Sequence, residues 1–222
     1  MKMNRIVIYP LVVMLVGAIG LPVVYARGMQ GEVNQAATVI QRFTEIPEKG
    51  IPEQILRDAK GLAILTVLKA GFFVSGSGGT GVVVARTAKG WSGPSAIGTG
   101  GAGFGFQIGG EVTEFVIVLN TDDAVRAFSR GGNVILGGDL SVAAGPVGRN
   151  LEAGVTPVAA IYTYSRSQGL FAGISLEGTV IVARNGLNDE YYHRAVTPEQ
   201  ILSGRIKPPA GAKRLLRVLA RY

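Results

Sequence analysis

Glycine, gathered into clusters between runs of β-branched and aromatic residues, restricts the fold of this chain more than any other feature. Of the 222 residues, 33 are glycine, which is roughly twice the usual share. No Gly-X-Y repeat is present, which excludes collagen. The runs between the clusters, such as VVVAR at 82–86 and EVTEFVIVLN at 111–120, are typical of strands. Within such strands, clustered glycines indicate bulges, sharp bends and close approach of neighbouring backbones.

Helices are predicted on both sides of this strand region. Apolar residues recur at helical spacing over 32–46, and Pro52 begins a second short helix, with Gly61 as its C-terminal cap. A third helix follows the cap Thr121, a fourth follows a capping box at Thr197, and a final helix covers 210–221. The predicted fold class is therefore α+β: a glycine-rich antiparallel sheet, able to close into a barrel, flanked by N-terminal and C-terminal helices.

Turn signals predict how the strands connect. Turn signals recur about every 8–14 residues through the strand region, which favours a meandering antiparallel sheet. The segment NGLNDE at 185–190 has the composition of a hairpin turn, and EYYHRAV at 190–196 is expected to supply another strand.

The N-terminus has the layout of a targeting segment. Lys2 and Arg5 precede an uncharged apolar stretch over 6–24, and Val24-Tyr25-Ala26 offers small residues at the −3 and −1 positions. This pattern predicts a secretory signal peptide over 1–26 and a single domain over 27–222. An uncleaved membrane anchor is the alternative. The chain is then exported to the periplasm or cell envelope, in peripheral association with a membrane.

Composition excludes several kinds of site. The chain has no cysteine, and His193 is its one histidine. Disulfides, thiol nucleophiles and cysteine-ligated zinc are therefore absent, and most zinc sites need more histidines than one. No regularly spaced oxygen ligands suggest calcium, so the sequence predicts neither a metal nor a cofactor.

The remaining motifs do not support an enzyme. Segments 76–81 (GSGGTG) and 98–103 (GTGGAG) fit G-x-G-x-x-G. Both lead into strand-like sequence, whereas a dinucleotide site needs a helix there. Ser92 and Ser175 miss the nucleophile-elbow pattern. The acidic pair at 122–123 opens a helix, where the macrodipole favours it. We therefore expect a non-enzymatic protein.

The C-terminal helix carries a basic face. From 205 to 222 there are six basic residues and no acidic ones. Leu215, Val218, Leu219 and Tyr222 form an apolar stripe, and the cations lie on another side of the helix. The predicted lipid-binding residues are those of this helix, helped by two cations near 60: Lys213, Arg214, Arg217, Arg221, Arg57 and Lys60.

Such a helix can attract an anionic bilayer by charge and insert its apolar side chains shallowly. The alternative is that the stripe packs against the sheet and the arginines only face water. Nucleic acid, which the pI near 9.9 also suggests, is disfavoured by the predicted export and by the lack of basic–aromatic interleaving.

Several blocks in order resemble the SYLF domain family, which occurs in bacteria and in eukaryotic membrane-trafficking and actin-patch proteins. They include GLAILTVLKAGFFVSGSGGTGVVVAR (61–86), WSGPSAIGTGGAGFGFQIGG (91–110) and YSRSQGLFAGISLEG (164–178). The resemblance implies a lipid-binding module, with phosphoinositide binding in eukaryotic relatives and actin binding in some fungal ones. The segment matching the eukaryotic lipid-binding helix, 31–46, has few charges and no basic face, so phosphoinositide specificity is not expected here.

Three functions therefore compete. The first is a non-enzymatic peripheral module of the cell envelope that binds anionic phospholipid, such as phosphatidylglycerol or cardiolipin. The second is a structural or protein-interaction module of the envelope, of the actin-binding type in fungal relatives, whose basic helix meets an acidic protein. The third is a closed sheet that encloses a small apolar ligand.

Overall fold

The structure is a computed structural model that describes residues 28–45, 50–146, 159–169 and 179–222. The predicted signal peptide, or the membrane anchor that is its alternative, lies outside these ranges and stays a prediction. Ser175 also lies outside them. Within the described ranges, no helix combines the length and apolar character needed to span a bilayer.

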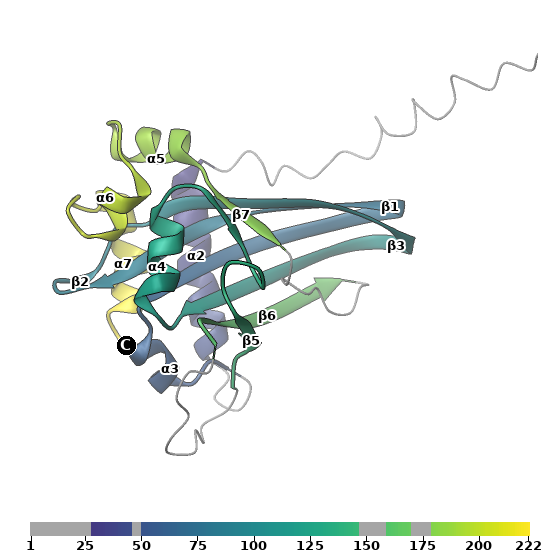
Figure 1. Cartoon of the computed structure of the whole chain (residues 1–222), viewed down its shortest axis with the longest axis horizontal. Coiled ribbons are helices and arrows are strands. Elements are labelled where there is room, and N and C mark those ends of the chain that lie inside the picture. Colours follow the sequence, from purple (N-terminus) through teal and green to yellow (C-terminus); the bar gives the residue numbers. More distant parts are fainter. Residues whose placement is uncertain (1–27, 46–49, 147–158, 170–178) are drawn as a thin grey trace, which may run out of the picture.

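Helices occupy both ends of the described chain, and strands fill the middle (Figure 1). The helices are α2 (Met29–Thr44), α3 (Glu53–Asp58), α4 (Asp122–Ser129), α5 (Asn185–Tyr192), α6 (Pro198–Leu202), the 3₁₀ turn η2 (Ala210–Ala212) and α7 (Lys213–Leu219). The strands are β1 (Gly61–Thr87), β2 (Gly90–Trp91), β3 (Ser95–Leu119), β4 (Asn133–Ile135), β5 (Val142–Ala144), β6 (Ile161–Gly169) and β7 (Val180–Ala183). The α+β prediction is confirmed.

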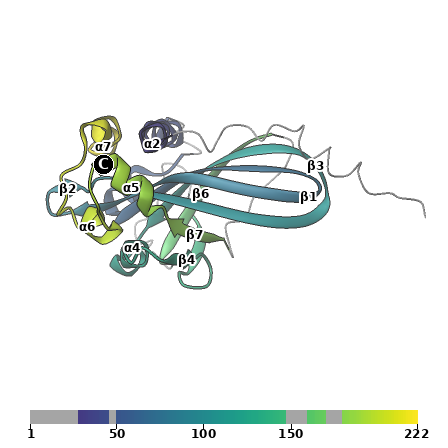
Figure 2. The ribbon, with the colours of Figure 1, turned by 90° about the horizontal axis from the view of Figure 1, so that it is seen from above.

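β1 and β3 form one long antiparallel ribbon, paired from Gly61↔Leu119 to Val83↔Ser95. Its register shifts between Phe72 and Val74, where the ribbon bends and turns back (Figure 1). The antiparallel arrangement is confirmed, and its two main strands, of 27 and 25 residues, are longer than the spacing of turn signals predicts. Figure 2 shows the resulting curled sheet from above, with the bend far from the helices.

The bend brings the two halves of β1 against each other. The Arg86 N–H donates to the Lys60 carbonyl oxygen at 2.8 Å. A Cβ built on Gly81 would lie 1.9 Å from the Ile64 carbonyl oxygen, and one built on Gly61 would lie 2.9 Å from the Val84 carbonyl oxygen. Glycine is needed here because any side chain would enter the neighbouring backbone.

The two glycine clusters lie opposite each other across the ribbon. Gly76 pairs with Ala102, Gly78 with Gly100, and Thr80 with Gly98. Neither cluster opens a helix, and so neither has the geometry of a dinucleotide site. Both are backbone-paired strand, as the sequence predicts, and glycine serves close approach within the sheet.

Helices cover both faces of the half of the sheet that lies away from the bend (Figure 2). Ile64 and its partner Val116 point to the core beneath α2, α3 and α7, whereas Leu65 and Phe115 point to the core beneath α4 and α6. Strands buried on both faces have no polar side to alternate with. This explains the continuous apolar run that begins at Leu62.

Three local predictions are wrong. The turn over 185–190 and the strand over 190–196 are replaced by α5, which His193 ends in a left-handed conformation with φ 53°. The buried Asn188 holds this helix to the start of β3, accepting from the Ala96 N–H at 2.7 Å. The third is Gly61, which begins β1 instead of capping α3. One pair, β5 with β6, is parallel in an otherwise antiparallel sheet.

The two predicted N-terminal caps are confirmed. Thr121 accepts a hydrogen bond from the Ala124 N–H, and Thr197 forms a complete capping box with Gln200. Gly204, just beyond α6, has φ +72°, the left-handed conformation that glycine adopts freely after a helix.

Candidate basic face of the C-terminal helix

The apolar side of α7 is used in packing. Leu215, Val218 and Leu219 are buried and belong to the core formed with α2 and the sheet. This is the arrangement of the alternative stated above, in which the stripe packs inward. A helix held in this way has no apolar stripe left to insert into a bilayer, so any membrane attraction must rest on its charges.

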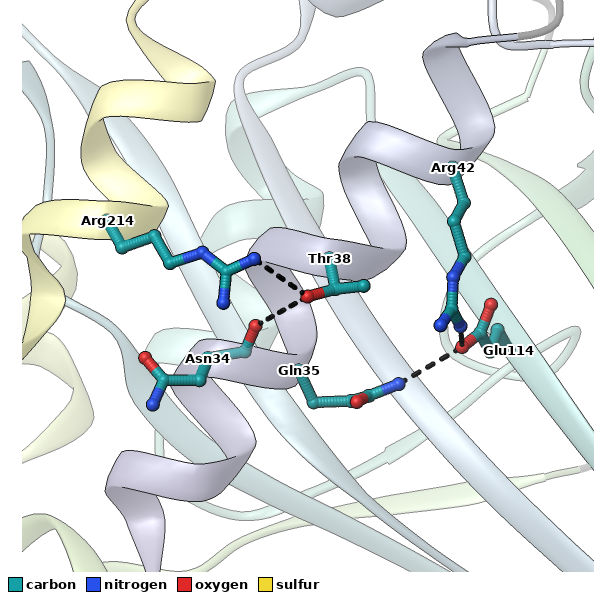
Figure 3. A network of polar contacts seen from close by, with 6 residues as sticks. All are labelled: Asn34, Gln35, Thr38, Arg42, Glu114 and Arg214. Atoms are coloured by element: carbon teal, nitrogen blue, oxygen red, sulfur yellow. Dashed lines mark hydrogen bonds and ion pairs between the residues drawn. The ribbon is translucent and has the colours of Figure 1, made fainter.

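The opposite side of α7 is basic and exposed. Lys213, Arg217 and Arg221 face solvent and form no ion pair within the described residues. Arg214 turns toward α2 instead, where its guanidinium donates to Thr38 Oγ1 at 3.1 Å (Figure 3). We call Lys213, Arg214, Arg217 and Arg221 the basic face.

The other two predicted cations lie on or just after α3. Arg57 is exposed and pairs with Glu53 one turn earlier, at 2.9 Å. The exposed Lys60 follows the helix and donates its backbone N–H to Leu119. The pairing with Glu53 neutralises much of the Arg57 charge, so Lys60 is the stronger contributor to a positive surface.

Arg86 and Trp91 connect α3 to the end of α7. The Arg86 guanidinium donates to the Leu56 and Ala59 carbonyls, at 2.9 and 3.0 Å, and lies 4.3 Å from the centre of the Trp91 ring. Trp91 Nε1 then donates to the Leu219 carbonyl at 3.0 Å. This chain of contacts places Arg57 and Lys60 at the same end of the molecule as the C-terminal part of the basic face (Figure 1).

Polar contacts below α2 fix the helix against which α7 packs. Gln35 and Arg42, which lie two turns apart on α2, both reach Glu114 of β3 (Figure 3). Glu32, nearer the start of the helix, pairs with Arg184 at 2.6 Å. Sequence reasoning did not identify these pairs. The one available signal was the position of Glu32 on the apolar side of the predicted helix.

Glu32 is the buried carboxylate of this interface. Its side chain is 4% exposed, and its Oε2 has no hydrogen-bond partner among the described residues. Burial raises the pKa of Glu32 above its usual 4.5, and Arg184 and Thr80 oppose that rise. The charged form is therefore less favourable in the folded chain than in the unfolded one.

This raised pKa predicts a pH dependence. The folded state binds the proton of Glu32 more tightly than the unfolded chain does. Proton binding at Glu32 therefore stabilises the fold at low pH, and this stabilisation is lost as the pH rises above about 4.5. We expect the free energy of unfolding of wild type to fall relative to Glu32→Gln over this rise. Urea unfolding of both proteins from pH 4 to pH 7 measures it. A constant difference would contradict the prediction.

No group of histidine, aspartate and glutamate in the described part of the chain is arranged to hold a metal ion. The candidate site is thus a surface of fixed positive charges.

Comparison with known sequences identifies relatives of this chain. A family profile described as "Ysc84: Las17-binding protein actin regulator" matches residues 100–222, more than half of the chain. SH3 domain-containing YSC84-like protein 1 of Bos taurus is 50% identical over 199 residues, covering 86% of this chain and 58% of the relative. LAS seventeen-binding protein 3 of Saccharomyces cerevisiae is 47% identical over 203 residues, covering 87% of this chain and 44% of the relative.

The chain thus spans about half the length of these relatives. The profile match covers most of β3 and every later helix and strand, including the whole of α7. The resemblance to the SYLF family is confirmed, and the chain belongs to the Ysc84 (SYLF) family.

Proposed function

We propose that this chain is a non-enzymatic binding module whose basic face holds an acidic protein surface. The observation that carries the proposal is the division of α7 into a buried apolar side and an exposed cationic side. Charges on a rigid helix can match a fixed pattern of carboxylates, and such complementarity gives specificity and fast association.

Actin is the first partner to test. The family is described as an actin regulator, and yeast relatives are named for binding Las17. Both are protein partners, and this favours the protein-interaction function over the lipid-binding one. The relatives extend well beyond the matched region, so the partner of this chain is part of the proposal.

An anionic membrane is the second candidate. It is supported by the contacts through Arg86 and Trp91, which bring Arg57 and Lys60 to the same end as Arg221. Each basic residue near an anionic surface contributes about 1 kcal/mol. The buried stripe removes the insertion step first expected for α7, so this binding would be purely electrostatic.

Co-sedimentation with actin filaments tests the main proposal. We expect wild type to bind, and Arg217→Glu/Arg221→Glu to bind at least tenfold more weakly, a change of about 1.4 kcal/mol. Raising the salt concentration should weaken wild-type binding, because the contacts are between exposed charges.

The matched control is Arg126→Glu/Arg130→Glu on α4, which makes the same change in net charge on the opposite face of the sheet. It should bind like wild type. Equal loss in both variants would mean that only net charge matters and would overturn the proposal. Binding of wild type to phosphatidylglycerol vesicles but not to filaments, with loss only in the α7 variant, would replace it by the membrane candidate.

A further inference from the structure

A pocket separate from the basic face opens at the N-terminal end of α2. Its volume is about 980 Å³, at the upper end of the range for small-molecule sites and large enough for several residues of an extended peptide. Its walls come from the start of α2, the end of α5 and the segment leading into α7.

The charged residues that line the pocket are mostly cations. Arg194, Arg205 and Lys207 line it, and Glu190 is the one acidic residue in the lining. All three cations are exposed, and none forms an ion pair with another described residue. The pocket therefore offers three charges to an incoming anion.

Apolar surface lies beside these charges. Met29 and Ile206 line the pocket together with the ring of Tyr191. A lining that combines cations with apolar and aromatic groups fits a ligand with both carboxylates and hydrophobic side chains. A small inorganic anion would leave the apolar wall without a partner.

The Tyr191 hydroxyl lies behind the wall of the pocket. Its oxygen is buried and has no partner among the described residues. The hydroxyl lies beside Gly211, and a Cβ built on that glycine would be 3.0 Å from the hydroxyl oxygen. Burial raises the pKa of Tyr191 to about 12, so the hydroxyl keeps its proton at neutral pH. Buried polar groups are nearly always paired, and among the described residues this hydroxyl is an exception.

We propose that this pocket binds an acidic peptide segment of a protein partner, with carboxylates on Arg205 and Lys207 and an apolar side chain against Ile206. The inference rests on the proposed function, since it assumes an acidic protein partner. It uses residues outside the basic face, and the two can therefore be tested separately.

Fluorescence anisotropy with labelled peptides tests the pocket. One peptide alternates glutamate with leucine, and the other has the same charge but glycine in place of leucine. We expect the leucine peptide to bind wild type at least fivefold more tightly than the glycine peptide. Arg205→Glu/Lys207→Glu should weaken it at least tenfold, and Arg205→Gln/Lys207→Gln should weaken it by less. Far-UV circular dichroism and a thermal melt verify that each variant is folded.

The α7 variant Arg217→Glu/Arg221→Glu is the matched control and should bind the peptide within twofold of wild type. If the chain does not bind actin filaments but the peptide affinities follow this pattern, the proposed function of the basic face fails and the inference about the pocket stands. Equal affinity for the two peptides would overturn the inference. So would an unchanged affinity in the pocket variants, or displacement of the peptide by tripolyphosphate as effectively as by unlabelled peptide.

Discussion

Gly81→Ala is expected to lower the free energy of unfolding by about 3 kcal/mol or more, the upper end for overpacking a filled interior. The new Cβ would lie 1.9 Å from the Ile64 carbonyl oxygen and 2.8 Å from the Leu65 Cα. Both are backbone atoms of the neighbouring half of β1, so no side-chain rotation relieves the contact. Urea unfolding followed by circular dichroism measures the loss.

Gly76→Ala provides the matched control on the same strand. No heavy atom lies within 4 Å of a Cβ built on Gly76, so its unfolding free energy should change by no more than about 0.5 kcal/mol. If both alanines destabilise the chain equally, close approach of the two halves of β1 is not the reason for glycine at 81.

The glycine clusters show how far local sequence reasoning extends. Strand-like neighbours correctly placed both clusters in a sheet and correctly excluded a dinucleotide loop. The pairing of Gly78 with Gly100 joins residues that lie 22 positions apart along the chain. Patterns of single residues carry no information about which distant backbone segments meet, and the spacing of turn signals therefore predicts strands shorter than these two.

Sequence patterns correctly predict those features that interactions between nearby residues stabilise. Thr121 and Thr197 cap helices through hydrogen bonds to residues three positions away, a distance that the sequence displays directly. α5 was misassigned because its Asn, Gly and Asp residues favour turns. Tertiary contacts override that preference, since Asn188 bonds to β3 and Tyr192 donates to the Pro94 carbonyl.

The candidate site also combines features that the sequence displays with features that only the fold decides. The cations of α7 are visible in the sequence because they cluster without acidic neighbours. Whether their helix inserts into a membrane or packs inward depends on what covers its apolar stripe, and only the fold supplies that answer. With Leu215 and Leu219 buried, the face that remains is polar and rigid, and such a face suits a protein surface better than a lipid interior.

Replacing Arg184 by methionine is expected to cost about 3 kcal/mol at pH 7, the lower end for breaking a buried ion pair. Arg184 is the ion-pair partner of Glu32, at 2.6 Å, and the glutamate is 4% exposed whereas the arginine is 23% exposed. Methionine keeps the aliphatic stem, which packs beside Gly98. The loss therefore reports the carboxylate left without its partner.

A double-mutant cycle with Glu32→Gln isolates the pair. Glu32→Gln/Arg184→Met should recover most of the loss, because no buried charge then remains uncompensated. Arg184 opposes the rise in the Glu32 pKa, so without it the carboxyl takes up a proton at higher pH. The loss in the single variant should therefore shrink as the pH is lowered toward 4.5.

The exposed pair Arg126–Asp123 supplies the comparison for that cycle. Arg126→Met should change the unfolding free energy by about 0.5 kcal/mol or less, because both partners stay in water. If Arg184→Met is as mild, or if its loss is the same with and without Glu32→Gln, the ion pair does not hold α2 to the sheet. The anchoring of α2, against which α7 packs, would then rest on apolar packing and on the contacts of Gln35 and Arg42 with Glu114.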